Sequence, residues 1–137
     1  NIMGIKEASG NISYVMKIAK YANDNFRIYS GNDDMIVPVL SAGGVGVISV
    51  LANICPKETH DLVMSYLNGD VKKSLDIQLK YLDVINNLFI ETNPIPVKEA
   101  MNYLGMNVGG YRLPLYKMTD KNREILINSM KEAGLCT

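Results

Sequence analysis

Three short apolar runs separated by segments of helical periodicity constrain the fold of this chain most strongly. The runs lie at residues 1–6, 26–31 and 45–50. Apolar residues recur at helical spacing over 12–23, and a shorter helix between the second and third runs ends at Ala42. Strands joined by helices of about ten residues pair in parallel, with right-handed crossovers. The runs are apolar on both faces, which is typical of a sheet buried on both sides.

The remainder of the chain predicts helices only. We expect helices over 57–68 and 70–91, a third that ends at Leu104, and a last one over 120–133. The long helix over 70–91 carries two apolar stripes, which indicate that it is covered on more than one side, and Leu82 is expected to be buried. The first stripe comprises Val71, Leu75, Leu79, Leu82, Ile85 and Phe89, and the second Ile77, Tyr81, Val84 and Leu88.

Three parallel strands leave two open edges, which favours a part of a larger fold. The pattern predicts an α/β fold, the carboxyl-terminal part of a (β/α)8 TIM barrel with about three parallel strands, followed by an all-helical C-terminal domain. We place the barrel segment at 1–69 and the helical domain at 70–137. Because the chain starts at Asn1 with an apolar run, we expect it to be a piece of a longer chain that associates through its open edges.

The composition excludes several classes of function. Fourteen basic and fourteen acidic residues cancel, so no nucleic-acid partner is expected. No apolar run reaches the roughly 18 residues that a membrane span needs. Cys55 and Cys136 lack a CxxC pattern, which indicates free thiols in a reducing compartment, and we expect a cytoplasmic protein. His60 is the single histidine, so a zinc site built on several histidines is excluded and no metal is expected.

Lys6 lies within the apolar run IMGIK, an unusual place for a charged side chain. One interpretation is a lysine whose stem packs while its ammonium reaches a rim. The other is a lysine that forms a Schiff base, because burial favours the neutral amine, which can attack a carbonyl. Glu7 alternates to the opposite face of a strand and is not automatically the partner of Lys6.

Two further stretches are open to interpretation. Asp33 and Asp34 could bind a metal, but adjacent carboxylates with no third ligand are more typical of helix capping. Gly31 and Asn32 lie where the loop after a barrel strand would line a site. Asn93, in NPIPVK, could cap a helix or contact a ligand.

Four blocks in this order and spacing resemble the dihydrodipicolinate synthase family: GIKEASGN, YSGNDD, GGVGVISVLAN and NPIPVKEAM. The later RLPL and KEAGL extend the resemblance over nearly the whole chain. The resemblance implies a (β/α)8 barrel with a helical carboxyl-terminal domain, assembled as a homotetramer of tight dimers. It also implies the condensation of pyruvate with aspartate semialdehyde in the biosynthesis of diaminopimelate and lysine.

The resemblance assigns roles to five residues. Lys6 matches the lysine that forms a Schiff base with pyruvate, so no separate cofactor is expected. Ile48 matches the isoleucine whose main chain contacts pyruvate. Gly31 and Asn32 match the loop at the entry for the second substrate, where some relatives carry aspartate in place of Asn32. Asn93 matches a residue near the site contributed by the helical domain.

The family places its threonine pair, its proton-relay tyrosine and its carboxylate-binding arginine upstream of Lys6, outside this sequence. The fragment alone is therefore expected to be a poor catalyst or none. Two alternatives remain. One is a related pyruvate-dependent aldolase, such as N-acetylneuraminate lyase or a keto-deoxy-sugar-acid aldolase, although GVISVLAN and NPIPVK together favour the synthase. The other is a non-catalytic half-barrel.

Overall fold

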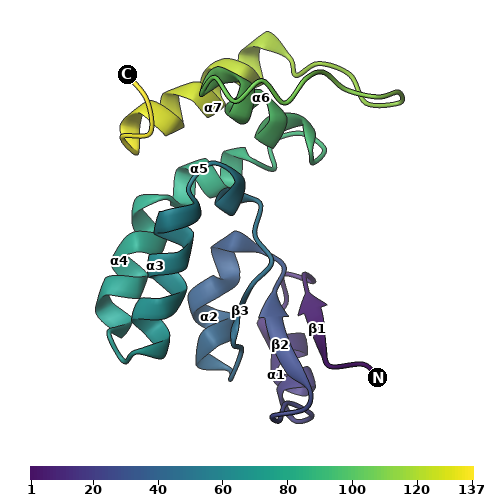
Figure 1. The fold of residues 1–137 in the computed structure, drawn as a ribbon, viewed down its shortest axis with the longest axis vertical. Helices are drawn as coiled ribbons and strands as arrows, with labels where there is room; N and C mark the ends of the chain where they lie inside the picture. The colour runs from purple at the N-terminus through teal and green to yellow at the C-terminus, as the bar shows by residue number, and fades with distance from the viewer.

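The computed structural model describes residues 1–137 and contains a three-stranded parallel sheet, helices against one face of it, and a helical second half (Figure 1). The strands are β1 (Gly4–Glu7), β2 (Arg27–Ser30) and β3 (Gly46–Val47), in the order β1–β2–β3. The helices, including the short 3-10 helices η1 and η2, are α1 (Ile12–Ala19), η1 (Asp33–Met35), α2 (Ile36–Ser41), η2 (Leu51–Asn53), α3 (Pro56–Leu67), α4 (Val71–Lys80), α5 (Leu82–Asn87), α6 (Ile95–Tyr103) and α7 (Asp120–Glu132).

The predicted parallel strands in sequential order are confirmed, although each is shorter than predicted. The third strand differs most, because regular pairing covers only Gly46–Val47. Hydrogen bonds to β2 nevertheless continue on both sides of it. Val45 N donates to Ile28 O (2.9 Å), and Ile48 N donates to Ser30 O (2.8 Å).

The helix α1 begins where predicted but ends earlier. Asn11 caps it, because its Oδ1 accepts a hydrogen bond from Tyr14 N (3.1 Å). The helix ends at Ala19, because the next residues form a turn in which Tyr21 N donates to Ile18 O (2.9 Å). The predicted extension to residue 23 is therefore wrong.

The helices α1 and α2 pack against one face of the sheet, which is the arrangement of a barrel wall (Figure 1). Ile28 of β2 is completely buried between Val15 of α1 and Val39 of α2. The opposite sheet face carries no helix from this half of the chain (Figure 1). That face is the one on which Lys6 lies.

The single helix predicted over 70–91 is wrong, because the chain forms α4 and α5 with a break at Tyr81. The backbone of Tyr81 leaves the helical region (φ −99°, ψ 6°), and its side chain is buried in the core of the helical half. The buried face nevertheless continues across the break, because Ser74, Gln78, Tyr81, Ile85 and Leu88 follow one another at helical spacing and are all buried.

The first of the two predicted stripes is wrong on α4, whereas most of the second is buried. Leu75 and Leu79 are 41% and 57% exposed, whereas Ser74 and Gln78 are buried. Both buried side chains are held by hydrogen bonds across the packing surface, because Ser74 Oγ donates to Leu62 O of α3 (2.8 Å) and Gln78 bonds the start of α2. Burial of a polar side chain is favourable when its hydrogen bonds are made. Leu82, expected to be buried, is only half-buried.

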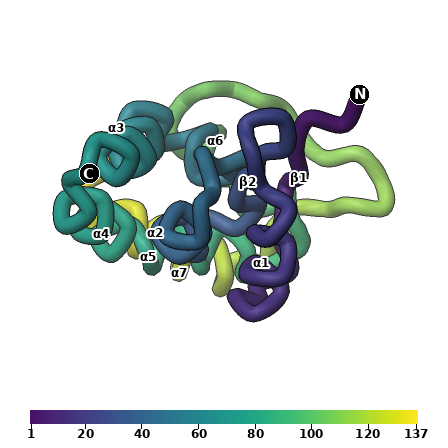
Figure 2. Tube along the Cα trace, turned by 90° about the horizontal axis from the view of Figure 1, so that it is seen from below, coloured from purple at the N-terminus to yellow at the C-terminus, as the bar shows by residue number.

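The helices α3 and α4 lie side by side (Figure 1 and Figure 2). The bond between Ser74 and Leu62 therefore crosses the predicted domain boundary between residues 69 and 70. The main core likewise joins Leu51 of η2 to α5, α6 and α7. The division into 1–69 and 70–137 stays a prediction.

Truncation of Leu88 tests the main core better than truncation of Leu82, because Leu82 is only half-buried. Leu88 is completely buried in this core, so Leu88→Ala should lower the free energy of unfolding by about 2–5 kcal/mol. Leu79→Ala, which truncates a side chain that is 57% exposed, should change it by less than about 0.5 kcal/mol. Urea unfolding followed by circular dichroism measures both. Equal losses for the two variants would contradict this assignment of the core.

Glu91 lies in the turn that follows α5 and binds the start of α7. Its Oε1 accepts hydrogen bonds from Thr119 N (3.0 Å), Thr119 Oγ1 (2.8 Å) and Asn122 Nδ2 (2.8 Å). Burial raises the pKa of Glu91, but these bonds from Thr119 and Asn122 outweigh it and hold the pKa below its usual value. The carboxylate form is thus favoured in the folded chain.

The lowered pKa of Glu91 makes the free energy of unfolding depend on pH. The stabilisation by Glu91 is complete above its usual pKa, and it is lost as the pH falls through the lower value of the folded chain. We expect the urea midpoint to fall less in Glu91→Gln than in the unchanged chain between neutral pH and about pH 3. Glu124→Gln, at an exposed position of α7, is the control and should fall as the unchanged chain does.

Candidate functional site

Lys6 lies on the sheet face that α1 and α2 do not cover. It pairs in register with Tyr29 of β2, and both side chains line a hollow of about 500 Å³. We call this the lysine hollow. It is lined by Met3, Gly4, Ile5, Lys6, Asp24, Arg27, Tyr29 and Ile48. Two of the sequence-predicted site residues, Lys6 and Ile48, therefore share one concave surface.

Lys6 is exposed, as expected for an open barrel segment, and Ile2 and Met3 beside it are 77% and 78% exposed. None of the four ion pairs in the chain includes Lys6. The predicted alternation is confirmed, because Glu7 is buried on the other side and its Oε1 accepts a hydrogen bond from Ser9 N (2.7 Å). Lys6 thus offers its amine to the hollow without a carboxylate partner.

Gly31 lies beside the stem of Lys6. Gly31 is buried, and its N donates to Glu7 O (2.6 Å), which ties the end of β2 to the end of β1. A Cβ atom at Gly31 would lie 2.6 Å from Ala8 Cβ and 3.0 Å from Lys6 Cε. Glycine is therefore required here by a close approach and not by backbone conformation. The predicted role of Gly31 at the entry for the second substrate stays a prediction.

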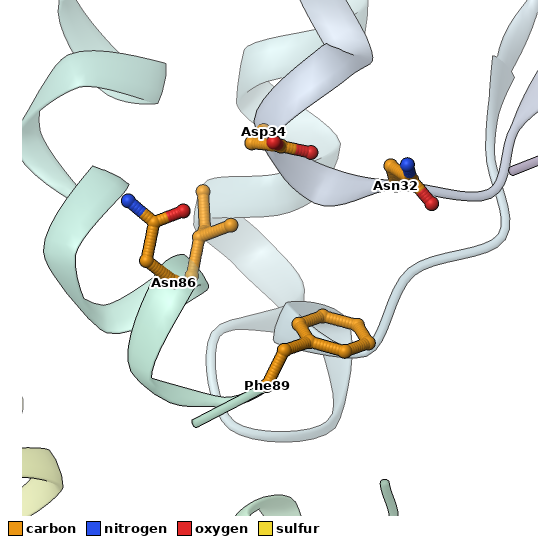
Figure 3. Close-up of a pocket in the computed structure, with 5 residues that line it drawn as sticks. Asn32, Asp34, Asn86 and Phe89 are labelled. Atoms are coloured by element: carbon orange, nitrogen blue, oxygen red, sulfur yellow. The ribbon is translucent and has the colours of Figure 1, made fainter. Parts of the chain in front are cut away.

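Asn32 faces a second hollow. This hollow, of about 220 Å³, is lined by Asn32, Asp34, Ile85, Asn86 and Phe89, and we call it the loop hollow (Figure 3). It joins the loop after β2 to α5 and the turn that follows, so residues far apart in the sequence meet there. Asn32 lines the loop hollow and not the lysine hollow, although its neighbour Gly31 lies beside the stem of Lys6.

Ile48 presents its backbone next to the lysine hollow. Its N–H is used in the bond to Ser30 O, whereas its carbonyl accepts no hydrogen bond within the chain. Its side chain is 49% exposed. The groups in this hollow that can donate to the oxygens of a small keto acid are the Lys6 amine, the Arg27 guanidinium and the Tyr29 hydroxyl, and the Ile48 carbonyl is a free acceptor beside them.

Asn93 lies in an exposed turn just before α6 and lines neither hollow. The structure therefore does not bring Asn93 together with Lys6. Its assignment as a binding residue stays a prediction.

Asp33 is the site residue whose role the sequence did not indicate. Capping of its own helix was predicted, but its Oδ2 accepts hydrogen bonds from Val50 N (2.9 Å) and Leu51 N (3.1 Å), at the start of η2. That prediction is wrong, because the carboxylate turns inward and is only 1% exposed. A partner 17 residues away along the chain leaves no local sequence signal.

The remaining candidate chemistry is limited. Cys55 and Cys136 are both free, and burial raises the pKa of the Cys55 thiol to about 12. No three His, Cys, Asp or Glu side chains come together in a way that could hold a metal ion. No helix combines the length and the apolar character that a membrane span needs.

Parallel strands with helices on one face, and a lysine near their carboxyl ends, define a segment of an α/β barrel. The model of the dihydrodipicolinate synthetase family matches residues 1–133. The chain therefore belongs to this family.

Individual relatives agree with the family match. The chain is 63% identical over 135 residues to the 4-hydroxy-tetrahydrodipicolinate synthase of Caldicellulosiruptor saccharolyticus, covering 98% of this chain and 45% of that relative. It is 56% identical to the synthase of Clostridium perfringens, with 98% and 46% covered. The crystal structure of the enzyme from Cyanidioschyzon merolae with lysine bound superposes with a TM-score of 0.93 at 36% identity, covering 98% of this chain and 46% of that one.

These matches confirm the predicted family and fold class. The chain spans about half the length of the relatives it matches, and the matching part is a segment of their TIM barrel together with the helices that follow.

Proposed function

We propose that this chain carries the Schiff-base lysine of a 4-hydroxy-tetrahydrodipicolinate synthase. The observation that carries the proposal is the amine of Lys6, which forms no ion pair and shares the lysine hollow with Ile48, whose carbonyl is free. Identity of 63% to a synthase supports this activity over the related aldolases. The substrates are then pyruvate and aspartate semialdehyde, and no separate cofactor takes part.

The chemistry follows from a neutral amine at Lys6. Its Nζ attacks C2 of pyruvate, and loss of water from the carbinolamine leaves an iminium. Loss of a proton from C3 gives an enamine, which forms a carbon–carbon bond to the aldehyde carbon of aspartate semialdehyde. The amino group of that substrate then displaces Lys6 from the imine carbon, which closes a ring and frees the lysine.

The proton transfers in these steps require an acid and a base beside the lysine. In this chain no titratable side chain is bonded to Lys6, and Tyr29 is the only tyrosine of the lysine hollow. We propose that the remaining part of the family barrel supplies the relay. The chain alone should therefore trap pyruvate slowly.

The test uses the chain in two forms. One is the chain alone, and the other is a chimera in which it follows the amino-terminal part of the Caldicellulosiruptor saccharolyticus relative. Each is mixed with pyruvate, reduced with borohydride and examined by peptide mass spectrometry. We expect an adduct on Lys6 in both, formed faster in the chimera, and consumption of aspartate semialdehyde by the chimera alone. Cleavage of N-acetylneuraminate or of a keto-deoxy sugar acid instead would favour the related aldolases, and no adduct in either form would favour an inert half-barrel.

We also propose a homo-oligomer, a tetramer in the complete protein, in the cytoplasm. The outer edges of β1 and β3 are unpaired, and an open strand edge favours association. Two free cysteines fit a reducing compartment. Sedimentation of the chimera and of the chain alone measures the association, and a dilute monodisperse monomer in both would contradict it.

A further inference from the structure

Hydrogen bonds connect the carboxyl ends of the three strands in sequence. Gly31 N donates to Glu7 O at the first junction, and Ile48 N donates to Ser30 O (2.8 Å) at the second. After Ile48, no further backbone bond joins this segment to the loop after β2. The position of the free Ile48 carbonyl therefore depends on what holds the residues after it.

The side chain of Asp33 holds those residues. It extends from the loop after β2, and its Oδ2 accepts hydrogen bonds from both Val50 N and Leu51 N. These two bonds lie directly beyond Ile48 and Ser49. With only 1% of Asp33 exposed, water competes little for the bonds, so they fix the segment firmly. The other oxygen, Oδ1, is buried and has no partner in the chain.

A second buried link starts next to Asp33, at residues 34–37, but leads to a different part of the chain. Gln78 of α4 accepts a hydrogen bond from Val37 N (2.8 Å), and its amide donates to Asp34 O. Gln78 is 5% exposed, so it resembles Asp33 in burial and in the number of bonds it makes. Gln78 ties residues 34–37 to α4 in the helical half. Asp33 instead ties the loop after β2 to the residues that follow β3.

We propose that Asp33 is a positioning residue for the lysine site. It holds residues 48–51 against the loop that contains Gly31, so that the Ile48 carbonyl keeps its place relative to the stem of Lys6. The inference deepens the proposed function and rests on it. Asp33 acts through the backbone and touches no substrate.

The first experiment measures the link itself, in the chain alone. Amide hydrogen exchange of Val50 and Leu51 is compared in the unchanged chain, Asp33→Ala, Asp33→Asn and Gln78→Ala. We expect loss of protection in Asp33→Ala only. Asn keeps one oxygen that can accept both bonds, and its NH2 group takes the place of the unpartnered Oδ1. Unchanged protection in Asp33→Ala, or loss in Gln78→Ala to the same extent, would overturn the link.

The second experiment measures its consequence at Lys6, in the chimera. Borohydride trapping is followed over a range of pyruvate concentrations, which separates the half-saturating concentration from the limiting rate. We expect Asp33→Ala to lower the rate of trapping by about tenfold to 100-fold, which is the effect of a displacement of about 1 Å between the reacting groups. Asp33→Asn should restore most of it, and Gln78→Ala should trap as the unchanged chimera does.

The outcomes separate this inference from the proposed function. If the unchanged chimera forms no adduct, the proposed function fails and the inference fails with it. If the unchanged chimera forms the adduct and Asp33→Ala matches it, only the inference fails. Equal losses in Asp33→Ala and Gln78→Ala would show general loosening, and an Asp33→Asn variant as slow as Asp33→Ala would show that the hydrogen bonds do not do the positioning. Thermal unfolding of every variant shows whether it is folded.

Discussion

Lys6→Ala should abolish the borohydride-trapped pyruvate adduct in the chimera and remove most of its turnover. The reason is chemical, because no other amine lines the lysine hollow. Lys6→Arg should fail as well, since a guanidinium stays protonated and cannot attack a carbonyl. Stability should change little in both variants, because Lys6 is exposed and forms no ion pair.

Lys17→Ala is the matched control for this result. Lys17 is an exposed lysine on α1, outside the lysine hollow, and its loss should leave the adduct unchanged. An adduct that persists in Lys6→Ala and maps to another lysine would contradict the assignment of the nucleophile. Trapping by the chain alone at a rate close to that of the chimera would contradict the proposed relay from the rest of the barrel.

The strands and their order could be predicted because they depend on local pattern. Apolar runs separated by helical periodicity allow few arrangements, and right-handed crossovers reduce them to parallel neighbours. The place of Lys6 at the uncovered sheet face follows from alternation along the strand, which also placed Glu7 on the buried side. These parts of the site needed no knowledge of distant contacts.

The failures have a common physical cause, which is packing between segments far apart in the sequence. On α4, apolar Leu75 and Leu79 are exposed and polar Gln78 is buried, because Gln78 finds its hydrogen bonds on α2 and η1. Periodicity counts apolar residues and carries no information about such partners. Asp33 was misassigned for the same reason, since its partners Val50 and Leu51 belong to another segment.

Gly31→Ala should destabilise the chain and slow the reaction at Lys6 together. The added Cβ would lie 2.6 Å from Ala8 Cβ, a distance that neither backbone can accept without moving. We expect the free energy of unfolding to fall by about 1–3 kcal/mol, the usual effect of overpacking. Because the same Cβ lies 3.0 Å from Lys6 Cε, the lysine stem must also shift, and pyruvate trapping in the chimera should fall.

Two variants separate the effect on stability from the effect on Lys6. Gly110→Ala is the control, because its Cβ would meet nothing within 4 Å, and it should change stability by less than about 0.5 kcal/mol. Ala8→Gly combined with Gly31→Ala removes the closest contact and should recover part of the lost stability, because Glu7 O would still lie 3.0 Å from the added Cβ. The contact with Lys6 Cε remains in that double variant, so trapping should stay slow. Recovery of both properties together would show that Gly31 acts on the lysine only through general stability, whereas recovery of stability alone would establish that it sets the position of the lysine stem.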